Sequence, residues 1–255
     1  MSDVREAVLD DGREVVVKRG HAPGATAAEA AGLRWLAAAG TVPVPAVHSH
    51  DGDRLVIDRV PAGRPTAAAA ERFGRGLAGL HSAGAPAFGA PPPDGPAQAW
   101  IGRAPMANVP AADWASWYAA DRVLPYVRTA VDAGTFSPAE AAVFERACAR
   151  IPPSAEPPAR LHGDLWNGNV LWDGHDVWLI DPAAHGGHRE TDLAMLHLFG
   201  CPHLDRVLAA YDEATPLADG RRDRIGLHQL FPLLVHTVLF GRSYAARALV
   251  AARSF

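Results

Sequence analysis

The stretch Leu161-His162-Gly163-Asp164-Leu165-Trp166-Asn167-Gly168-Asn169, followed by Ile180-Asp181-Pro182, decides the fold and the chemistry expected of this chain. Two carboxylates, Asp164 and Asp181, flank the amide of Asn169, and Asp181 ends a hydrophobic run. One carboxylate can accept the proton of an attacking hydroxyl, while the amide oxygen and the other carboxylate are hard ligands for Mg²⁺. This order indicates phosphoryl transfer, with Asp164 as catalytic base and Asn169 and Asp181 as metal ligands.

The local pattern explains how these groups could meet. Glycines break the segment around Asp164, so it forms a short loop and not a long helix. Residues 169–172 and 177–180 read as two strands joined by a turn at Asp173-Gly174, which would bring Asn169 and Asp181 together. A single Gly-Asp pair is more simply a surface turn. The complete ordered set favours the catalytic interpretation.

Composition limits the class of protein. The chain has 255 residues, of which 49% are hydrophobic and 20% charged, enough for one enzyme unit of two lobes. Its net charge of −4 gives no basic surface for nucleic acid or anionic lipid. Cys148 and Cys201 lack the spacing of a zinc site or a disulfide framework, and no signal-like or membrane-spanning run occurs. We therefore expect a soluble cytoplasmic monomer with no nucleic-acid or membrane partner.

The N-terminal quarter reads as a small sheet with one helix. Four strands are predicted, at residues 5–9, 13–18, 42–47 and 54–60. A helix is predicted from Thr26 to Ala39, with Thr26 as N-cap, Glu29 as its capping-box partner and Gly40 as the stop. Clustered Pro and Gly after Val60 place the boundary there, so we expect an ATP-binding lobe at residues 1–62 and a catalytic, acceptor-binding lobe at 63–255.

Four residues of this first lobe are candidates for nucleotide contacts. In kinase-like folds a strand lysine contacts the ATP phosphates and a helix glutamate holds it, and Lys18 and Glu29 suit these roles. The simpler alternatives are a solvated strand end for Lys18 and a helix cap for Glu29. The segment ending in Asp58 and Val60 occupies the place of a hinge, whose backbone groups would read the adenine edge.

The second lobe begins with a predicted helix from Thr66 to Ser82, followed by an irregular loop or flap at residues 85–96. A group of aromatic residues comes next, comprising Trp100, Trp114, Trp117 and Tyr118. These rings either form the core of a helix spanning residues 111–133 or line an acceptor pocket.

The quoted stretch, together with Ile180-Asp181-Pro182-Ala183 and the run Gly187-His188-Arg189-Glu190-Thr191-Asp192-Leu193-Ala194-Met195, resembles the fructosamine kinase / ketosamine-3-kinase family. That family belongs to the aminoglycoside-phosphotransferase-like and protein-kinase-like enzymes. The Trp after Asp-Leu and the Gly-His-Arg-Glu run distinguish it from choline and aminoglycoside kinases. Weaker similarity extends over residues 4–245.

The resemblance implies a role for further residues. Trp166 would stack near the acceptor sugar, and His162 would brace the catalytic loop by hydrogen bonds. His188, Arg189 and Asp192 would fix the segment that follows Asp181. The chain departs from the family at Ala184-His185-Gly186, where aromatic residues are common. It also begins, at residues 1–3, roughly inside the family's phosphate-covering loop, so either the true start lies upstream or the small lobe is one strand short.

We therefore expect an α/β (α+β) bilobal protein-kinase-like fold, with a small antiparallel-sheet N-lobe that lacks its first strand and a larger, mainly helical C-lobe. The resemblance implies an ATP- and Mg²⁺-dependent kinase for a ketosamine, either a fructosamine or a ribulosamine, free or protein-bound, acting at the 3-hydroxyl in deglycation. The alternatives are a kinase of another small-molecule hydroxyl, aminoglycoside or choline-like, and a nucleotide-binding pseudoenzyme.

Overall fold

The N-terminal lobe is a four-stranded antiparallel sheet covered by one helix. The computed structural model describes residues 3–255, so the part of the expected phosphate-covering loop at residues 1–2 lies outside it. The strands β1 (Asp3–Val8), β2 (Glu14–Arg19), β3 (Val47–Asp51) and β4 (Arg54–Asp58) pair in the order β1-β2-β4-β3. Leu55 and Ile57 pack against Ala30 and Leu33 of α1 (Ala25–Ala37), so the alternation along β4 places the helix on one face.

The predicted strand at residues 42–47 is wrong, because only Val47 belongs to a strand. Pro43 and Pro45 have no N–H to offer a ladder, and the carbonyl of Pro43 instead accepts a hydrogen bond of 3.0 Å from Leu179 N.

The predicted cap of α1 is also wrong. Gly24 is the N-cap, at a φ of 76° with no side-chain hydrogen bond. Thr26 is buried and donates its hydroxyl to the Gly52 carbonyl at 3.0 Å, which ties α1 to the β3–β4 turn. The Glu29 carboxylate accepts a hydrogen bond from Lys18 and forms no capping box. The expected contact with Lys18 is therefore present, and the expected capping role is wrong.

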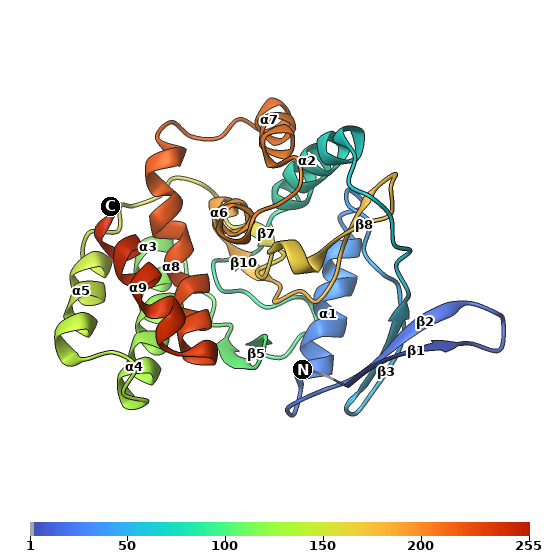
Figure 1. Cartoon of the computed structure of the whole chain (residues 1–255), viewed down its shortest axis with the longest axis horizontal. Helices are drawn as coiled ribbons and strands as arrows, with labels where there is room; N and C mark the ends of the chain where they lie inside the picture. Colours follow the sequence, from blue (N-terminus) through green and yellow to red (C-terminus); the bar gives the residue numbers. More distant parts are fainter. Residues whose placement is uncertain (1–2) are drawn as a thin grey trace.

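The C-terminal lobe is mainly helical (Figure 1) and carries three short two-stranded antiparallel sheets. Two of them are hairpins, β5 (Gln98–Ile101) with β6 (Ala104–Ala107) and β8 (Val170–Trp172) with β9 (Val177–Leu179), and the third pairs β7 (Ala159–Leu161) with the more distant β10 (His185–Gly187). The helices are α2 (Ala67–Ser82), α3 (Trp114–Trp117), α4 (Leu124–Asp132), α5 (Pro138–Cys148), α6 (Arg189–Phe199), α7 (Leu204–Ala214), α8 (Arg221–Phe240) and α9 (Arg242–Arg253). Within residues 3–255, no helix combines the length and apolar character needed to cross a bilayer.

Two sequence predictions for this lobe have different outcomes. The helix starting at Thr66 is confirmed, since the Thr66 hydroxyl accepts a hydrogen bond of 3.2 Å from Ala69 N and caps α2. The helix expected at residues 111–133 is present over residues 114–132, but it is not regular, because a π-helical segment, Tyr118–Val123, lies between α3 and α4. Pro125 lacks the N–H that would continue a regular ladder at this point.

The aromatic residues of this region divide between the two expectations. Trp114, Trp117 and Tyr118 are buried in the helical core, as the simpler interpretation predicted. Trp100, on β5, instead lines the cavity described below, and its ring meets His21 edge-on at 5.1 Å between centroids.

The lobes meet at the β8–β9 hairpin. Gly63, in the segment between β4 and α2, donates its N–H to the carbonyl of Trp172 in β8 at 2.6 Å. The N–H of Leu179, in β9, donates to the carbonyl of Pro43 in the N-terminal lobe. A Cβ atom on Gly63 would lie 2.1 Å from the Asp173 carbonyl carbon, so the chain passes over the hairpin in backbone contact. Figure 1 shows β8 near α1 and the sheet, with the helices of the second lobe beyond it.

Candidate active site

The loop between β7 and β8 holds Asp164 beside Asn169. Its turn requires Gly163, which has a φ of 80° and would place a Cβ atom 2.1 Å from the Ala183 carbonyl oxygen. Asn169 donates its Nδ2 to the Asp164 carbonyl at 2.8 Å and to the Asp164 carboxylate at 3.0 Å. The amide nitrogen is thereby engaged, which leaves Oδ1 of Asn169 as the atom available to a cation.

The buried carboxylate of Asp192 holds this loop in place. Asp192 accepts hydrogen bonds from His162 N at 2.8 Å and Gly163 N at 3.0 Å, and lies 3.2 Å from His81 Nε2. His81 Nδ1 lies 2.8 Å from the Tyr211 hydroxyl, so the network reaches α7. The side chain of His162 contacts the Ile180 carbonyl at 2.9 Å. The contact with Ile180 agrees with the bracing role expected for His162, whereas the hydrogen bonds of Asp192 hold the catalytic loop and not the segment after Asp181.

A three-residue ionic cluster joins the lobes at the site. Lys18 Nζ donates to Glu29 Oε1 at 2.6 Å and also contacts the Asp181 carboxylate. Lys18 is only 6% exposed, which excludes the solvated strand end that the sequence left open. Burial disfavours its charge, but the carboxylates of Glu29 and Asp181 outweigh that effect and raise the pKa of Lys18. Asp181 has a φ of 53°, a strained conformation for a residue other than glycine.

Asp164 is poised to accept a proton near neutral pH. Burial, with smaller contributions from the nearby charges of Asp181 and Asp192, raises the pKa of this carboxyl to about 7 against the opposing effect of the hydrogen bond from Asn169. A general base works best when its pKa lies close to the working pH. The environment of Asp164 therefore suits general-base catalysis.

One cavity of about 950 Å³ collects most of the predicted site residues. Those on its wall are Lys18, Glu29, Asp164, Trp166, Asn169 and Asp181. Trp166 is 38% exposed there and packs edge-on against Phe199, 5.9 Å between ring centroids. The sequence also missed cavity residues, notably His21, Asn108 and His236, because each is an isolated polar residue without a recognisable motif.

Asp58 and Val60 are not among the residues that line this cavity. The Asp58 carboxylate lies 2.5 Å from His48 Nε2 and accepts Ala46 N at 3.0 Å, and the Asp58 N–H bonds to the Ala46 carbonyl. The side chain of Asp58 thus ties β4 to the segment before β3. Backbone recognition of adenine by Asp58 and Val60 remains a prediction.

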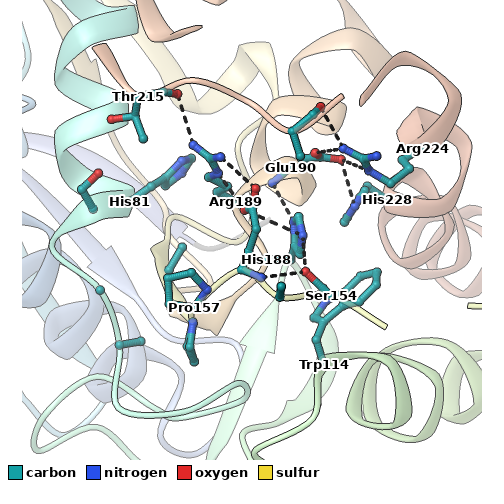
Figure 2. Close-up of a pocket in the computed structure, with 18 of the residues that line it drawn as sticks. His81, Trp114, Ser154, Pro157, His188, Arg189, Glu190, Thr215, Arg224 and His228 are labelled. Carbon is teal, nitrogen blue, oxygen red and sulfur yellow. Dashed lines mark hydrogen bonds and ion pairs between the residues drawn. The ribbon is translucent and has the colours of Figure 1, made fainter. Parts of the chain in front are cut away.

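A second cavity, of about 740 Å³, contains a His188, Glu190 and His228 cluster (Figure 2). His188 Nδ1 accepts the Glu190 N–H at 3.2 Å, so a neutral ring carries its proton on Nε2, which faces Ser154 at 3.1 Å. Burial holds the pKa of His188 well below its usual range. Arg224 already binds both oxygens of Glu190, at 2.6 and 2.9 Å. These pairings assign the cluster to packing of α6 on α8 and argue against a metal site.

Known proteins match this chain along nearly its whole length. The profile of the fructosamine kinase family matches residues 6–253. The chain belongs to this family. A probable ketoamine kinase of Thermus thermophilus is 33% identical over 224 residues, covering 87% of this chain and 79% of the relative. Another, from Enterococcus faecium, is 36% identical over 177 residues, but the match spans 67% of this chain and only 61% of that relative.

Solved structures confirm the protein-kinase-like fold of this family member. A Thermobifida fusca protein provisionally assigned as a fructosamine-3-kinase has a TM-score of 0.91 and 47% identity, covering 99% of this chain and 89% of its own. An ADP-bound aminoglycoside phosphotransferase has a TM-score of 0.61 at 13% identity, covering 99% and 92%, and shows the likeness of the fold alone. The bilobal α/β architecture expected from the sequence is therefore confirmed.

Proposed function

We propose that this protein transfers the γ-phosphoryl group of ATP to the 3-hydroxyl of a ketosamine, a fructosamine or a ribulosamine. The observation that carries the proposal is the convergence of Lys18, Asp164, Asn169 and Asp181 on one cavity. Membership of the fructosamine kinase family and similarity to probable ketoamine kinases support the acceptor class.

The oxygen atoms on the cavity wall fit a magnesium ion. Asn169 offers Oδ1, and the Asp181 carboxylate is half exposed to the cavity, which together provide the hard ligands that Mg²⁺ prefers. Mg²⁺, when bound, would neutralise charge on the transferred phosphoryl group. Lys18, oriented by Glu29, would contact the phosphates of ATP.

The chemical step assigns one role to Asp164. Its carboxylate would accept the proton of the sugar hydroxyl as the hydroxyl oxygen bonds to the γ-phosphorus and the bond to the ADP oxygen breaks. Asn169 donates to the same carboxylate and holds it in place. Since Asp164, Asn169 and Asp181 are all present and correctly grouped, we favour an active enzyme over a pseudoenzyme.

The character of the cavity favours a sugar over a polycationic acceptor. Its lining includes the carboxylates of Glu29, Asp164 and Asp181, and the proposed mechanism uses each of them, for Lys18, for the acceptor proton and for Mg²⁺ respectively. An aminoglycoside with several ammonium groups requires free carboxylates. The exposed ring of Trp166 offers a face on which a sugar could stack.

An ADP-release assay tests the proposal. Wild-type protein with Mg-ATP should turn over fructosyl-lysine and ribulosyl-lysine, with little activity on aminoglycosides or amino alcohols. The 3-deoxy analogue of the best ketosamine should bind without turnover, and phosphorus NMR should place the product phosphate on O3. Turnover of the 3-deoxy analogue, or activity confined to aminoglycosides or amino alcohols, would contradict the proposed acceptor.

A further inference from the structure

A buried amide on the wall of the catalytic cavity has a donor without a partner. Asn108 follows the β5–β6 hairpin and is only 2% exposed, and its Nδ2 lacks a hydrogen-bond partner among the residues that the structure describes. Its Oδ1 accepts a hydrogen bond of 2.9 Å from Arg122 Nη2. A buried amide donor left unpaired is costly, so it calls for an explanation.

Arg122 fixes the orientation of this amide. A guanidinium can only donate hydrogen bonds, so the oxygen of Asn108 must face Arg122 and the nitrogen must face away. Arg122 also donates to the Ala107 carbonyl at 2.7 Å, which ties it to the residue just before Asn108. The hydrogen bond from Arg122 to Asn108 Oδ1 therefore directs the N–H groups of the amide away from the guanidinium.

Burying the charged side chain of Arg122 costs free energy. Arg122 is fully buried and has no carboxylate within ion-pair distance in the described part of the chain. Its guanidinium carbon lies 4.6 Å from the Trp117 ring centroid and 5.5 Å from that of Phe231, so aromatic faces replace a counter-ion. Burial lowers the pKa of Arg122 to about 10, which still leaves it charged at neutral pH.

Arg122 also lies in the π-helical segment 118–123 that interrupts the predicted helix. Such single-turn π segments are rare and occur often at functional sites. The β5–β6 hairpin, the π-helical segment and the buried Arg122 side chain thus meet at the amide of Asn108. This amide borders the same cavity as Asp164. If Asn108 only held Arg122 in place, its amide oxygen would be sufficient. The unpaired nitrogen would then add nothing to stability.

We propose that Asn108 is a further acceptor-binding residue, whose amide N–H donates to a hydroxyl or carbonyl oxygen of the acceptor sugar, and that Arg122 positions it. This inference rests on the proposed function, because it requires a sugar acceptor in the cavity. The positive charge of Arg122 polarises the amide and strengthens its donor. A site with a buried donor also discriminates against acceptors that lack the matching oxygen.

The test uses Asn108→Asp, which separates binding from folding. The introduced carboxylate keeps an oxygen toward Arg122 and gives the buried cation a counter-ion, so the melting temperature should stay equal or rise. The same change removes the N–H donor. The KM for a ketosamine should therefore rise on the order of 10- to 100-fold, while the KM for ATP stays within about twofold of wild type.

A matched control is available on the same hairpin. Gln98→Glu makes the same change of amide to carboxylate, but Gln98 is exposed and its Nε2 already donates to the Ala99 carbonyl at 2.9 Å. Both KM values should remain those of wild type in this variant. Asn108→Ala serves as a second test variant and should raise the acceptor KM as well, although it leaves Arg122 without its acceptor.

Calorimetric titration of a ketosamine without ATP distinguishes the two proposals. If wild-type protein binds the ketosamine without phosphorylating it, the proposed function fails. If Asn108→Asp binds it as tightly as wild type does, the role of Asn108 is wrong. The role of Asn108 is also overturned if Asn108→Asp lowers the melting temperature and raises the KM values for acceptor and ATP equally, because that pattern describes a purely structural residue.

Discussion

At the scale of single residues, the burial that suits Asp164 to its proposed catalytic role also lowers the stability of the fold when the carboxyl is ionised. Its carboxyl group loses hydration in the fold, and only the Asn169 amide compensates directly. The native state therefore holds the proton more tightly than the unfolded chain does. Stability from this group is present at low pH and is lost as pH rises from the ordinary carboxyl pKa of 3.8 toward about 7.

Replacing Asp164 by Asn should move activity and stability in opposite directions. Turnover should fall on the order of 10²- to 10⁴-fold, since the proton acceptor is lost, while ATP affinity is retained. The melting temperature should exceed that of wild type at pH 8, and the difference should shrink as the pH falls through 5 toward 3.8. Asp53→Asn, in the exposed β3–β4 turn, is the control and should change none of these quantities. Wild-type turnover by the Asp164 variant would show that another group accepts the proton.

The pH dependence of the wild-type enzyme provides a second prediction. Since Asp164 must be ionised to act as a base, kcat/KM should rise with pH and level off above a midpoint near its pKa of about 7. The midpoint of kcat should lie lower, because bound cations favour the carboxylate. Initial rates from pH 5 to 9 would reveal both midpoints. A flat profile across this range would exclude Asp164 as the group that limits the rate.

Trp166 allows a test of the acceptor side. Its exposed ring lines the cavity, so Trp166→Ala should raise the KM for the ketosamine by about tenfold and leave the KM for ATP nearly unchanged. Steady-state kinetics with each substrate varied in turn would measure this. Equal loss for both substrates, with a lower melting temperature, would instead identify Trp166 as a packing residue, held by its contact with Phe199.

At the scale of secondary structure elements, the sequence was most informative where spacing alone controls geometry. The β8–β9 hairpin and the Thr66 cap of α2 follow from turn and capping chemistry, and both are correct. The prediction of a strand at residues 42–47 was wrong, because it followed the apolar residues there and the prolines of the segment prevent strand pairing.

The sequence could not have indicated the π-helical segment or the role proposed for Asn108. Helical periodicity is nearly the same with and without a single π turn, and Pro125 was the only warning. Asn108 and Arg122 are fourteen positions apart in sequence, and their pairing depends on how the β5–β6 hairpin packs on the helices. Tertiary packing of this kind leaves no local pattern.

The contact between β2 and α1 makes a prediction for nucleotide binding. Glu29→Gln keeps an oxygen near Lys18 but removes the charge that orients it, so the KM for ATP should rise by about tenfold with little change in the KM for the acceptor. Glu71→Gln is the matched control, because Glu71 pairs with Arg206 at 2.7 Å on the exposed surface of α2 and α7. An unchanged KM for ATP in Glu29→Gln would remove the glutamate from the nucleotide site.

At the scale of the whole molecule, the two lobes are joined where the proposed metal ligands lie. The β8–β9 hairpin that positions Asn169 and Asp181 bonds to the N-lobe through Pro43 and to the interlobe segment through Gly63. The cluster of Lys18 with Glu29 and Asp181 adds an ionic link across the same junction. Any shift between the lobes would therefore displace Lys18 and the proposed metal ligands together.

The last prediction tests this coupling at Gly63. A methyl group there would lie 2.1 Å from the Asp173 carbonyl carbon and 2.4 Å from Gly174 N, so Gly63→Ala must push the interlobe segment away from the hairpin. We expect a loss of about 1–3 kcal/mol of stability, as for other overpacked sites, and a higher KM for ATP with a lower kcat. The acceptor affinity measured without ATP should change little, because Trp166 and Asn108 lie within the second lobe.

Thermal unfolding and steady-state kinetics would measure these effects, with Ala62→Ser as the control at the neighbouring exposed position. The mechanism predicts that the two defects appear together, since one displacement causes both. A destabilised Gly63→Ala variant with wild-type kinetics would mean that the lobes hold their relative position without this contact, and that the ionic cluster around Lys18 is sufficient to align them.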